Sequence, residues 1–331
     1  MNINNITFCF LFQFLFVGNQ KVEISQTTNK PNSQQKQISK SNPANLIFES
    51  NDNGQSWQDI SEGLPENILS DRLVSNDKEL FVLTEKGIYQ KPTSEFFSKW
   101  KRENFYFNQN NIVMSKDGLL TFNRNGEFFK KIYSTNLLMP IYTSFKGNSV
   151  RTIFESASGT IFIGSDEGLF KSTNNGKTWN HVHKNGWVIK IVESDGVLLA
   201  TNQSGILRST NNGEQWSLVI NEGGVGIDLA VIDGGFAAIT YNTTSKTRRV
   251  RTSFDGGKSW NAIDESLPAH DLISSVVQSG KYLLCGHPDG IYRSADKGKS
   301  WNLILPSIGE KVFNLSVSGN LIYAIAREGG C

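Results

Sequence analysis

Carboxylate, imidazole, guanidinium and indole side chains recur in short polar turns between apolar runs. Acids and bases lie on neighbouring turns in a mixed pattern, which suits recognition of a protein or glycan partner by complementarity. Paired carboxylates could instead hydrolyse a glycosidic bond, but the separation that defines such a pair is a three-dimensional distance. The sequence therefore assigns no catalytic residue. It predicts ten binding residues: Arg124, Asp166, Glu167, Trp187, Glu222, His270, His287, Asp289, Arg327 and Glu328.

Two further patterns are typical of metal or phosphate sites, and neither is complete. His181 and His183 alternate as two zinc ligands could, but the chain holds only four His and no third ligand is evident. The Gly-rich run 223–226 lacks the Lys-Ser/Thr pair of a phosphate loop and precedes a β-rich segment. Lys plus Arg number 33 against 31 Asp plus Glu, so no phosphate-tracking surface is indicated. We expect no metal, no cofactor and no nucleic-acid partner.

One segment recurs five times with the pattern Ser-x-(Asp/Asn)-x-Gly-x-x-Trp, and we call it the box. Gly supplies a positive φ, the Asp or Asn oxygen can accept hydrogen bonds from turn amides, and Trp buries a large ring. Asn keeps the acceptor but loses the charge, so we interpret the box as a folding staple. The box residues are Ser50, Asp52, Gly54 and Trp57; Ser172, Asn174, Gly176 and Trp179; Ser209, Asn211, Gly213 and Trp216; Ser253, Asp255, Gly257 and Trp260; and Ser294, Asp296, Gly298 and Trp301.

A calcium loop is the alternative interpretation of the box. Calcium loops need several oxygen ligands at alternating positions. Lys177, Lys258, Lys297 and Lys299 stand among the would-be ligands, which argues strongly against this alternative.

Each box belongs to a unit of about 40 residues with four predicted strands, a to d. An alternating strand a ends in a Gly turn, a hairpin of strands b and c follows, and the box leads into strand d. In two units the box has decayed: Trp100 still ends the first, and Phe128 or Phe129 is expected to replace Trp in the second. Seven b strands are predicted, near Leu80, Leu119, Ile161, Leu198, Phe236, Leu283 and Leu321.

The two ends of the repeat region are complementary fragments. The chain opens at Leu46 with a c strand and a box, and it ends with strands a and b alone. We predict that they share one blade and so close an all-β, seven-bladed β-propeller over residues 45–331, without exposed sheet edges. Antiparallel alternation then places the b–c turns and d–a loops, which carry the candidate binding residues, on the face opposite the boxes.

Residues 1–44 do not fit the repeat. The apolar run Ile6–Val17 predicts a signal peptide over residues 1–20, being shorter than the roughly 20 residues of a membrane span. Residues 21–44 are a polar, low-complexity linker. We therefore expect an exported protein, secreted or in the cell envelope, with no membrane span after processing. Cys9 would leave with the signal, and a bridge between Cys285 and Cys331 stays open.

The units resemble the BNR or Asp-box repeats of sialidases, of sortilin-type receptors and of the photosystem II stability/assembly factor family. The resemblance covers about residues 45–331 and implies boxes on the propeller rim, away from the ligand face. Size, leader and seven units are most similar to the assembly-factor-like group. Sialidases resembling this chain would carry an Arg-Ile-Pro-type segment before the first box, and residues 42–46 contain no Arg. We predict a non-enzymatic binding or assembly module, with a glycan-acting hydrolase as the alternative.

Overall fold

The computed structural model describes residues 46–66, 68–76, 78–93, 98–104, 111–115, 118–147, 149–221 and 224–328. The chain divides into two units, Met1–Ser41 and Asn42–Cys331, and every described residue belongs to the second. The predicted signal peptide and linker lie outside the described residues, as do Glu222, Cys9 and Cys331. No helix that could span a membrane occurs in the described part of the chain.

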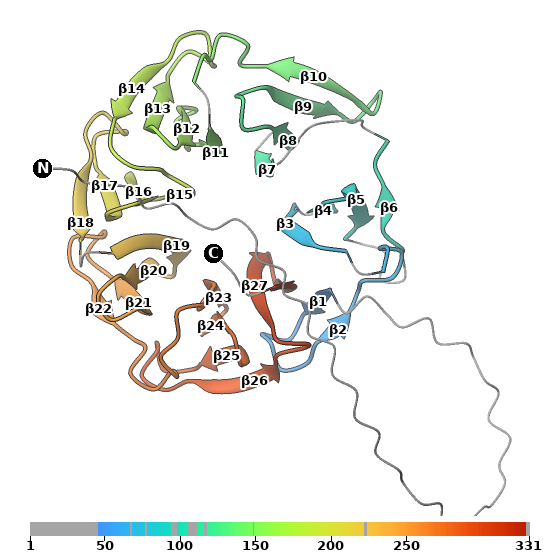
Figure 1. The fold of residues 1–331 in the computed structure, drawn as a ribbon, viewed down its shortest axis with the longest axis vertical. Coiled ribbons are helices and arrows are strands. Elements are labelled where there is room, and N and C mark those ends of the chain that lie inside the picture. The colour runs from blue at the N-terminus through green and yellow to red at the C-terminus, as the bar shows by residue number, and fades with distance from the viewer. Residues whose placement is uncertain are drawn as a thin grey trace, which may run out of the picture. The chain divides into compact units, whose positions relative to one another are not determined.

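Seven four-stranded antiparallel sheets surround one axis as the blades of a propeller (Figure 1). Blades 1 to 3 comprise β3 (Ser70–Ser75), β4 (Glu79–Thr84), β5 (Gly87–Pro92) and β6 (Lys101–Arg102); β7 (Asn111–Ser115), β8 (Gly118–Phe122), β9 (Phe128–Ile132) and β10 (Leu137–Ile141); and β11 (Val150–Glu155), β12 (Ile161–Ser165), β13 (Gly168–Ser172) and β14 (Asn180–His183). Blades 4 to 6 comprise β15 (Ile191–Ser194), β16 (Val197–Asn202), β17 (Gly205–Ser209) and β18 (Ser217–Ile220); β19 (Gly224–Ile232), β20 (Gly235–Asn242), β21 (Thr247–Ser253) and β22 (Asn261–Ala262); and β23 (Ser275–Ser279), β24 (Tyr282–His287), β25 (Gly290–Ser294) and β26 (Asn302–Pro306).

Blade 7 is built from both ends of the repeat region, as the sequence predicts. Its strand order is β27 (Lys311–Ser318), β28 (Leu321–Glu328), β1 (Ile47–Ser50) and β2 (Gln58–Asp59). Strands β1 and β28 pair antiparallel, with Ile47 opposite Ile325. All seven predicted b strands are confirmed as β4, β8, β12, β16, β20, β24 and β28.

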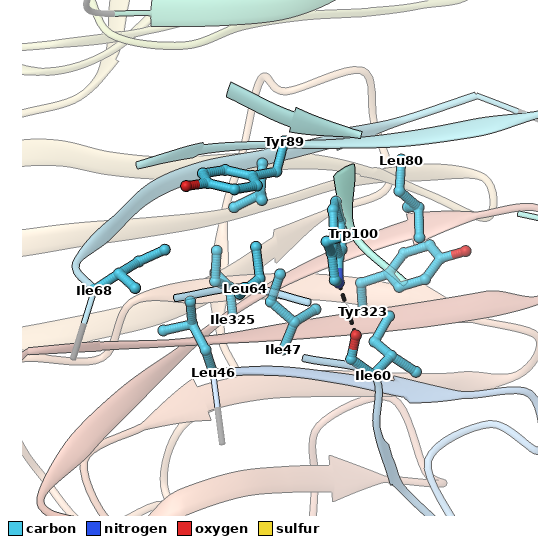
Figure 2. Close-up of a cluster of buried hydrophobic side chains, with 11 residues drawn as sticks. Leu46, Ile47, Ile60, Leu64, Ile68, Leu80, Tyr89, Trp100, Tyr323 and Ile325 are labelled. Carbon is cyan, nitrogen blue, oxygen red and sulfur yellow. Dashed lines mark hydrogen bonds between the residues drawn. The ribbon is translucent and has the colours of Figure 1, made fainter. Parts of the chain in front are cut away.

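A buried cluster joins blade 7 to blade 1 (Figure 2). Leu46 and Ile47 lie at the start of the closing strand and pack with Tyr323 of β28. From blade 1, Trp100 donates its indole N–H to the carbonyl of Ile60 at 2.7 Å. The closing strand therefore contributes to the interface between two blades as well as to its own sheet.

The core lies between the blades, and the b strands are its centre. Strands β8 and β12 are buried at every position, so they appear in the sequence as continuous apolar runs. The outermost strands, such as β14 and β18, are mostly half-buried or exposed. Because packing occurs blade on blade, the connections at each end of the strands are free to carry function.

The two decayed boxes have different outcomes. Trp100 directly precedes β6, as each box Trp precedes its d strand, and its side chain is buried. The expectation for the second unit is wrong, because Phe128 and Phe129 lie within c strand β9. A tight turn over residues 133–136 joins β9 to β10, with Asn136 at a φ of 54°. Spacing alone could not separate an aromatic residue inside a strand from one that follows a turn.

Candidate functional site

All five boxes have the same hydrogen-bond arrangement. The Ser hydroxyl donates to Oδ1 of the Asp or Asn at 2.8–3.0 Å and accepts the amide N–H of the box Gly at 2.7–3.0 Å. The same Oδ1 accepts a backbone amide four residues later at 2.9–3.0 Å. These bonds make the Asp or Asn oxygen part of the turn itself.

Several boxes also fasten their own blade to the preceding one. Gly213 has a φ of 74°, and a Cβ there would lie 2.3 Å from the ring of Phe162 in blade 3. A basic residue before the box Ser reaches the next box: Arg208 donates to the carbonyl of Gly256 at 2.6 Å, and Arg293 donates to that of Asn53 at 3.1 Å. The box is thus a contact between blades as well as a turn.

Acid is expected to weaken the boxes that carry Asp. Hydrogen bonds from Ser300 and Ser294 lower the pKa of Asp296 to about 2, and hydrogen bonds from Ser259 and Ser253 lower that of Asp255. For Asp52, burial raises the pKa, but hydrogen bonds from Ser56, Ser50 and Gln55 outweigh it and lower the pKa to about 2. A carboxyl whose pKa is lower in the folded chain contributes stability above its unfolded pKa, about 3.9. That contribution disappears as the pH falls through the folded value.

We therefore expect the stability advantage of the natural chain over a variant with Asp52→Asn, Asp255→Asn and Asp296→Asn to shrink between about pH 5 and pH 2. Urea unfolding of both proteins across this range measures the difference. Asn174 and Asn211 occupy the same position in the two remaining boxes, so the variant keeps a turn that the chain already forms. A difference that stays constant with pH would contradict the assignment of this role to the carboxylates.

Opposite the boxes, three side chains from neighbouring connections and one from strand β11 come together. Arg124 in the b–c turn of blade 2 forms an ion pair with Asp166 of blade 3 at 3.2 Å. Arg151 also pairs with Asp166, and its guanidinium carbon lies 5.4 Å from the centre of the Trp187 ring. Arg151 stands at an irregularity in β11, between Val150 and Thr152, where the pairing register with β12 shifts.

The loop that carries Trp187 is fixed by hydrogen bonds to blades 3 and 4. The amide of Val188 donates to the carbonyl of Ser165 at 3.0 Å, and the side chain of Asn202 donates to the carbonyl of Asn185 at 2.8 Å. The Trp187 ring itself is half-buried, so one part of it faces solvent. The loop therefore presents an aromatic surface from an ordered backbone.

The polar contacts continue into blade 5. Lys190, three residues after Trp187, forms an ion pair with Asp228 of β19 at 2.6 Å. The other oxygen of Asp228 accepts the amide of Val276 in blade 6 at 3.1 Å. We name the whole set the polar arc: Arg124, Asp166, Arg151, Trp187, Lys190 and Asp228.

His270, His287 and Asp289 form a separate group between blades 5 and 6. His287 is fully buried; its Nδ1 accepts the amide of Asp289 at 3.1 Å, so its Nε2 donates to the carbonyl of Pro268 at 2.9 Å. Burial lowers the pKa of His287, and the neutral ring satisfies both bonds. The prediction that His287 contacts a partner therefore does not hold, because its side chain is inaccessible and orders the turn instead. Asp289 and His270 remain partly exposed.

The other candidates lie apart from the polar arc. Glu167 is exposed beside Asp166, and its carbonyl lies 3.0 Å from Nε2 of His181. Arg327 and Glu328 are exposed at the end of β28. The ring of His181 stacks on Phe170 at 4.1 Å, and the described residues hold no group of ligating side chains that could bind a metal.

Arg151, Lys190 and Asp228 escaped the prediction from sequence. Arg151 and Asp228 lie within a strands, where alternation alone gives no reason to single out a charge. Both stand at register shifts in their strands, which redirect side chains. For Asp228 the available signal was a charged residue in an otherwise apolar strand. Strand β11 carries Glu155 as well as Arg151, and Lys190 precedes β15, so neither had that signal.

Comparison with solved structures identifies other propellers. No family model matches the sequence, and none of the curated proteins does. The GH74 xyloglucanase of Xanthomonas campestris superposes with a TM-score of 0.61 at 15% identity, over 82% of this chain and 53% of that one. The extracellular domain of a putative one component system from B. thetaiotaomicron superposes with a TM-score of 0.59 at 14% identity, over 76% of this chain and 36% of that one. Virginiamycin B lyase from Staphylococcus aureus superposes with a TM-score of 0.62 at 13% identity, over 85% of this chain and 98% of that one.

The chain thus spans about half of the xyloglucanase and about a third of the one component system's chain. At these identities the similarity establishes the fold alone. These neighbours include a xyloglucanase, a lyase and an extracellular domain, so function must be argued from the site.

Proposed function

We propose that this protein is an exported, non-enzymatic binding module that holds a protein or glycan partner against the polar arc. The observation that carries the proposal is the half-exposed Trp187 ring beside the Arg151 guanidinium, on a loop fixed by its backbone. Indole rings supply a large, rigid contact area and dominate binding energy at many interfaces. The loop is already ordered, so little conformational entropy is lost when a partner binds.

The charges around Trp187 suit complementary recognition. Arg124 and Lys190 are about half exposed and carry positive charge. Asp166 pairs with both Arg124 and Arg151. Such mixed charge selects partners and orients them more than it adds affinity. Carboxylates, hydroxyls and amides are all groups that these side chains can bind.

A glycan-acting hydrolase is the alternative. Asp166 accepts hydrogen bonds from two guanidinium groups, which fix its side chain and suit a positioning role. The polar arc thus supports binding better than proton transfer.

Replacement of Trp187 by Ala is expected to abolish partner binding and leave the melting temperature unchanged within a few degrees. The purified protein and the variant would be compared on a glycan array and by chemical crosslinking in the native source. Phe254→Ala is the matched control, because Phe254 is 51% exposed and lies in the box of blade 5 on the opposite face.

Equal binding by both variants would contradict the proposal. Release of reducing ends or unsaturated sugars from xyloglucan or polygalacturonate, lost in Asp166→Asn, would establish the hydrolase or lyase alternative instead.

A further inference from the structure

A groove of about 830 Å³ lies between blades 2 and 3, at the end of the strands that carries the boxes. One wall is the face of blade 2, and the other is the box of blade 3. Its volume falls within the range of specific ligand sites, roughly 300–1,000 Å³. Leu120, Lys130 and Met139 line it from blade 2, and Glu155 and Lys177 line it from blade 3.

At three other interfaces the box closes this space. At these three interfaces the blade presents a row of residues from strands b, c and d, and the Gly of the next box covers the b-strand member. Between blades 5 and 6 the box Gly instead lies against Ile263, which follows β22, and a Cβ at Gly298 would be 2.6 Å from it. A Cβ at Gly213 would lie 2.3 Å from Phe162, one at Gly257 would lie 3.0 Å from Leu199, and one at Gly54 would lie 2.9 Å from Leu284. No room for a ligand remains at such distances.

The box of blade 3 sits elsewhere. A Cβ at Gly176 would lie 2.2 Å from the ring of Tyr142, which follows β10, and not against the row of blade 2. Ser144 fixes this position, because its hydroxyl donates to the carbonyl of Gly176 at 2.5 Å and accepts the indole N–H of Trp179 at 3.2 Å. The row of Leu120, Lys130 and Met139, paired across β8, β9 and β10, therefore borders the groove.

The d-strand residue of this row is apolar in blade 2 and polar in the other six blades. Met139 is 46% exposed there, and Leu137, two residues away on the same face of β10, is 64% exposed. The corresponding first residues of the d strands in the other six blades are all polar: Gln58, Lys101, Asn180, Ser217, Asn261 and Asn302. Exposed apolar side chains that continue into a groove mark an interaction site.

We propose that this groove and strand β10 bind an extended segment of a partner protein whose apolar side chains alternate with carboxylates. The charged residues that line the groove are Lys130, Lys177 and Glu155, so the lining has one more positive than negative charge and favours a negatively charged ligand. Strand β10 is the terminal strand of its sheet among the described residues, and a peptide can extend such an edge as a further strand, although Pro140 has no N–H to donate to it. Side chains on one face of that strand would then lie beside Leu137 and Met139.

The test uses random twelve-residue peptides displayed on phage and selected on the full-length protein. Enriched peptides are expected to alternate apolar and acidic residues, and synthetic copies are measured by fluorescence anisotropy. Met139→Asn introduces the residue found at this position in blades 3, 5 and 6, and we expect it to weaken binding at least tenfold. Leu137→Asn should act in the same direction, and methylation of alternate peptide amides should also weaken binding.

Leu303→Asn is the matched control, because Leu303 is 45% exposed in β26, the d strand of blade 6. It should leave peptide binding unchanged, as should Trp187→Ala on the opposite face, which separates this proposal from the function proposed above. Peptides that bind equally to Met139→Asn and the natural chain would overturn the proposal. So would a dimer in sedimentation analysis that Met139→Asn dissociates, because the occupant would then be a second copy.

Discussion

Deletion of Leu46–Trp57 is expected to abolish cooperative unfolding of the propeller. The deletion removes β1 and its box, so β28 loses its partner along Ile322–Ile325 and blade 7 keeps two strands. It also removes Leu46 and Ile47 from the buried cluster that joins blade 7 to blade 1 (Figure 2). An open edge of buried apolar residues invites pairing with other chains, so we expect a broad thermal transition or aggregation.

The matched control removes an equal length from the predicted linker, residues 30–41, and should melt as the full chain does. A synthetic peptide spanning residues 46–61 supplies the missing strand in trans and should restore a cooperative transition. Closure by the terminal strand would be refuted if a chain that begins after Trp57 melted like the natural protein.

The closure of the ring was predictable because the sequence is repetitive. Five boxes at fixed offsets define the unit, and the fragment from Leu46 supplies the strand and box that the C-terminal fragment lacks. Each blade repeats the same pattern of strands and turns, so the Trp of an incomplete box, Trp100, could be located by its position. Repetition thus predicts topology well.

The functional site depends on departures from the repeat, and these were much harder to predict. Arg151 faces Trp187 from a register shift in β11, which alternation cannot reveal. His287 has the composition of a contact residue, yet it is buried because its turn needs both ring nitrogens. The groove beside Met139 lies where the box of blade 3 packs on Tyr142 and not on Leu120, an arrangement that involves two blades at once. A single sequence does not show which residues of neighbouring blades will contact each other.

A buried ion pair between blades 1 and 2 was also not predicted from the sequence. Its removal is expected to have a large effect on the free energy of unfolding. Blade 2 has no box, and Lys131 of β9 instead forms an ion pair with Glu103 of blade 1 at 2.6 Å, with side chains 3% and 6% exposed. Lys131 also donates to Gln90 at 3.0 Å and lies 5.0 Å from the centre of the Phe81 ring. This pair takes the place of a box as the polar contact between two blades.

Replacement of Glu103 by Leu is expected to lower the free energy of unfolding by about 3–5 kcal/mol, because it removes the carboxylate that pairs with the buried Lys131 ammonium. Adding Lys131→Met should recover most of the loss, since an apolar pair of similar volume has no charge to desolvate. Urea unfolding at pH 7 measures all three proteins.

The exposed pair of Lys99 with Glu62 is the control, with the same kind of contact at 2.7 Å but side chains 64% and 69% exposed. Glu62→Gln should change the free energy of unfolding by less than about 1 kcal/mol, because solvent screens the pair. Two results would contradict a stabilising role of this ion pair between blades 1 and 2. One is that Glu103→Leu lowers the free energy of unfolding no more than Glu62→Gln does. The other is that adding Lys131→Met lowers it further. Loss of a buried ion pair predicts the opposite: a large effect of Glu103→Leu that Lys131→Met reverses.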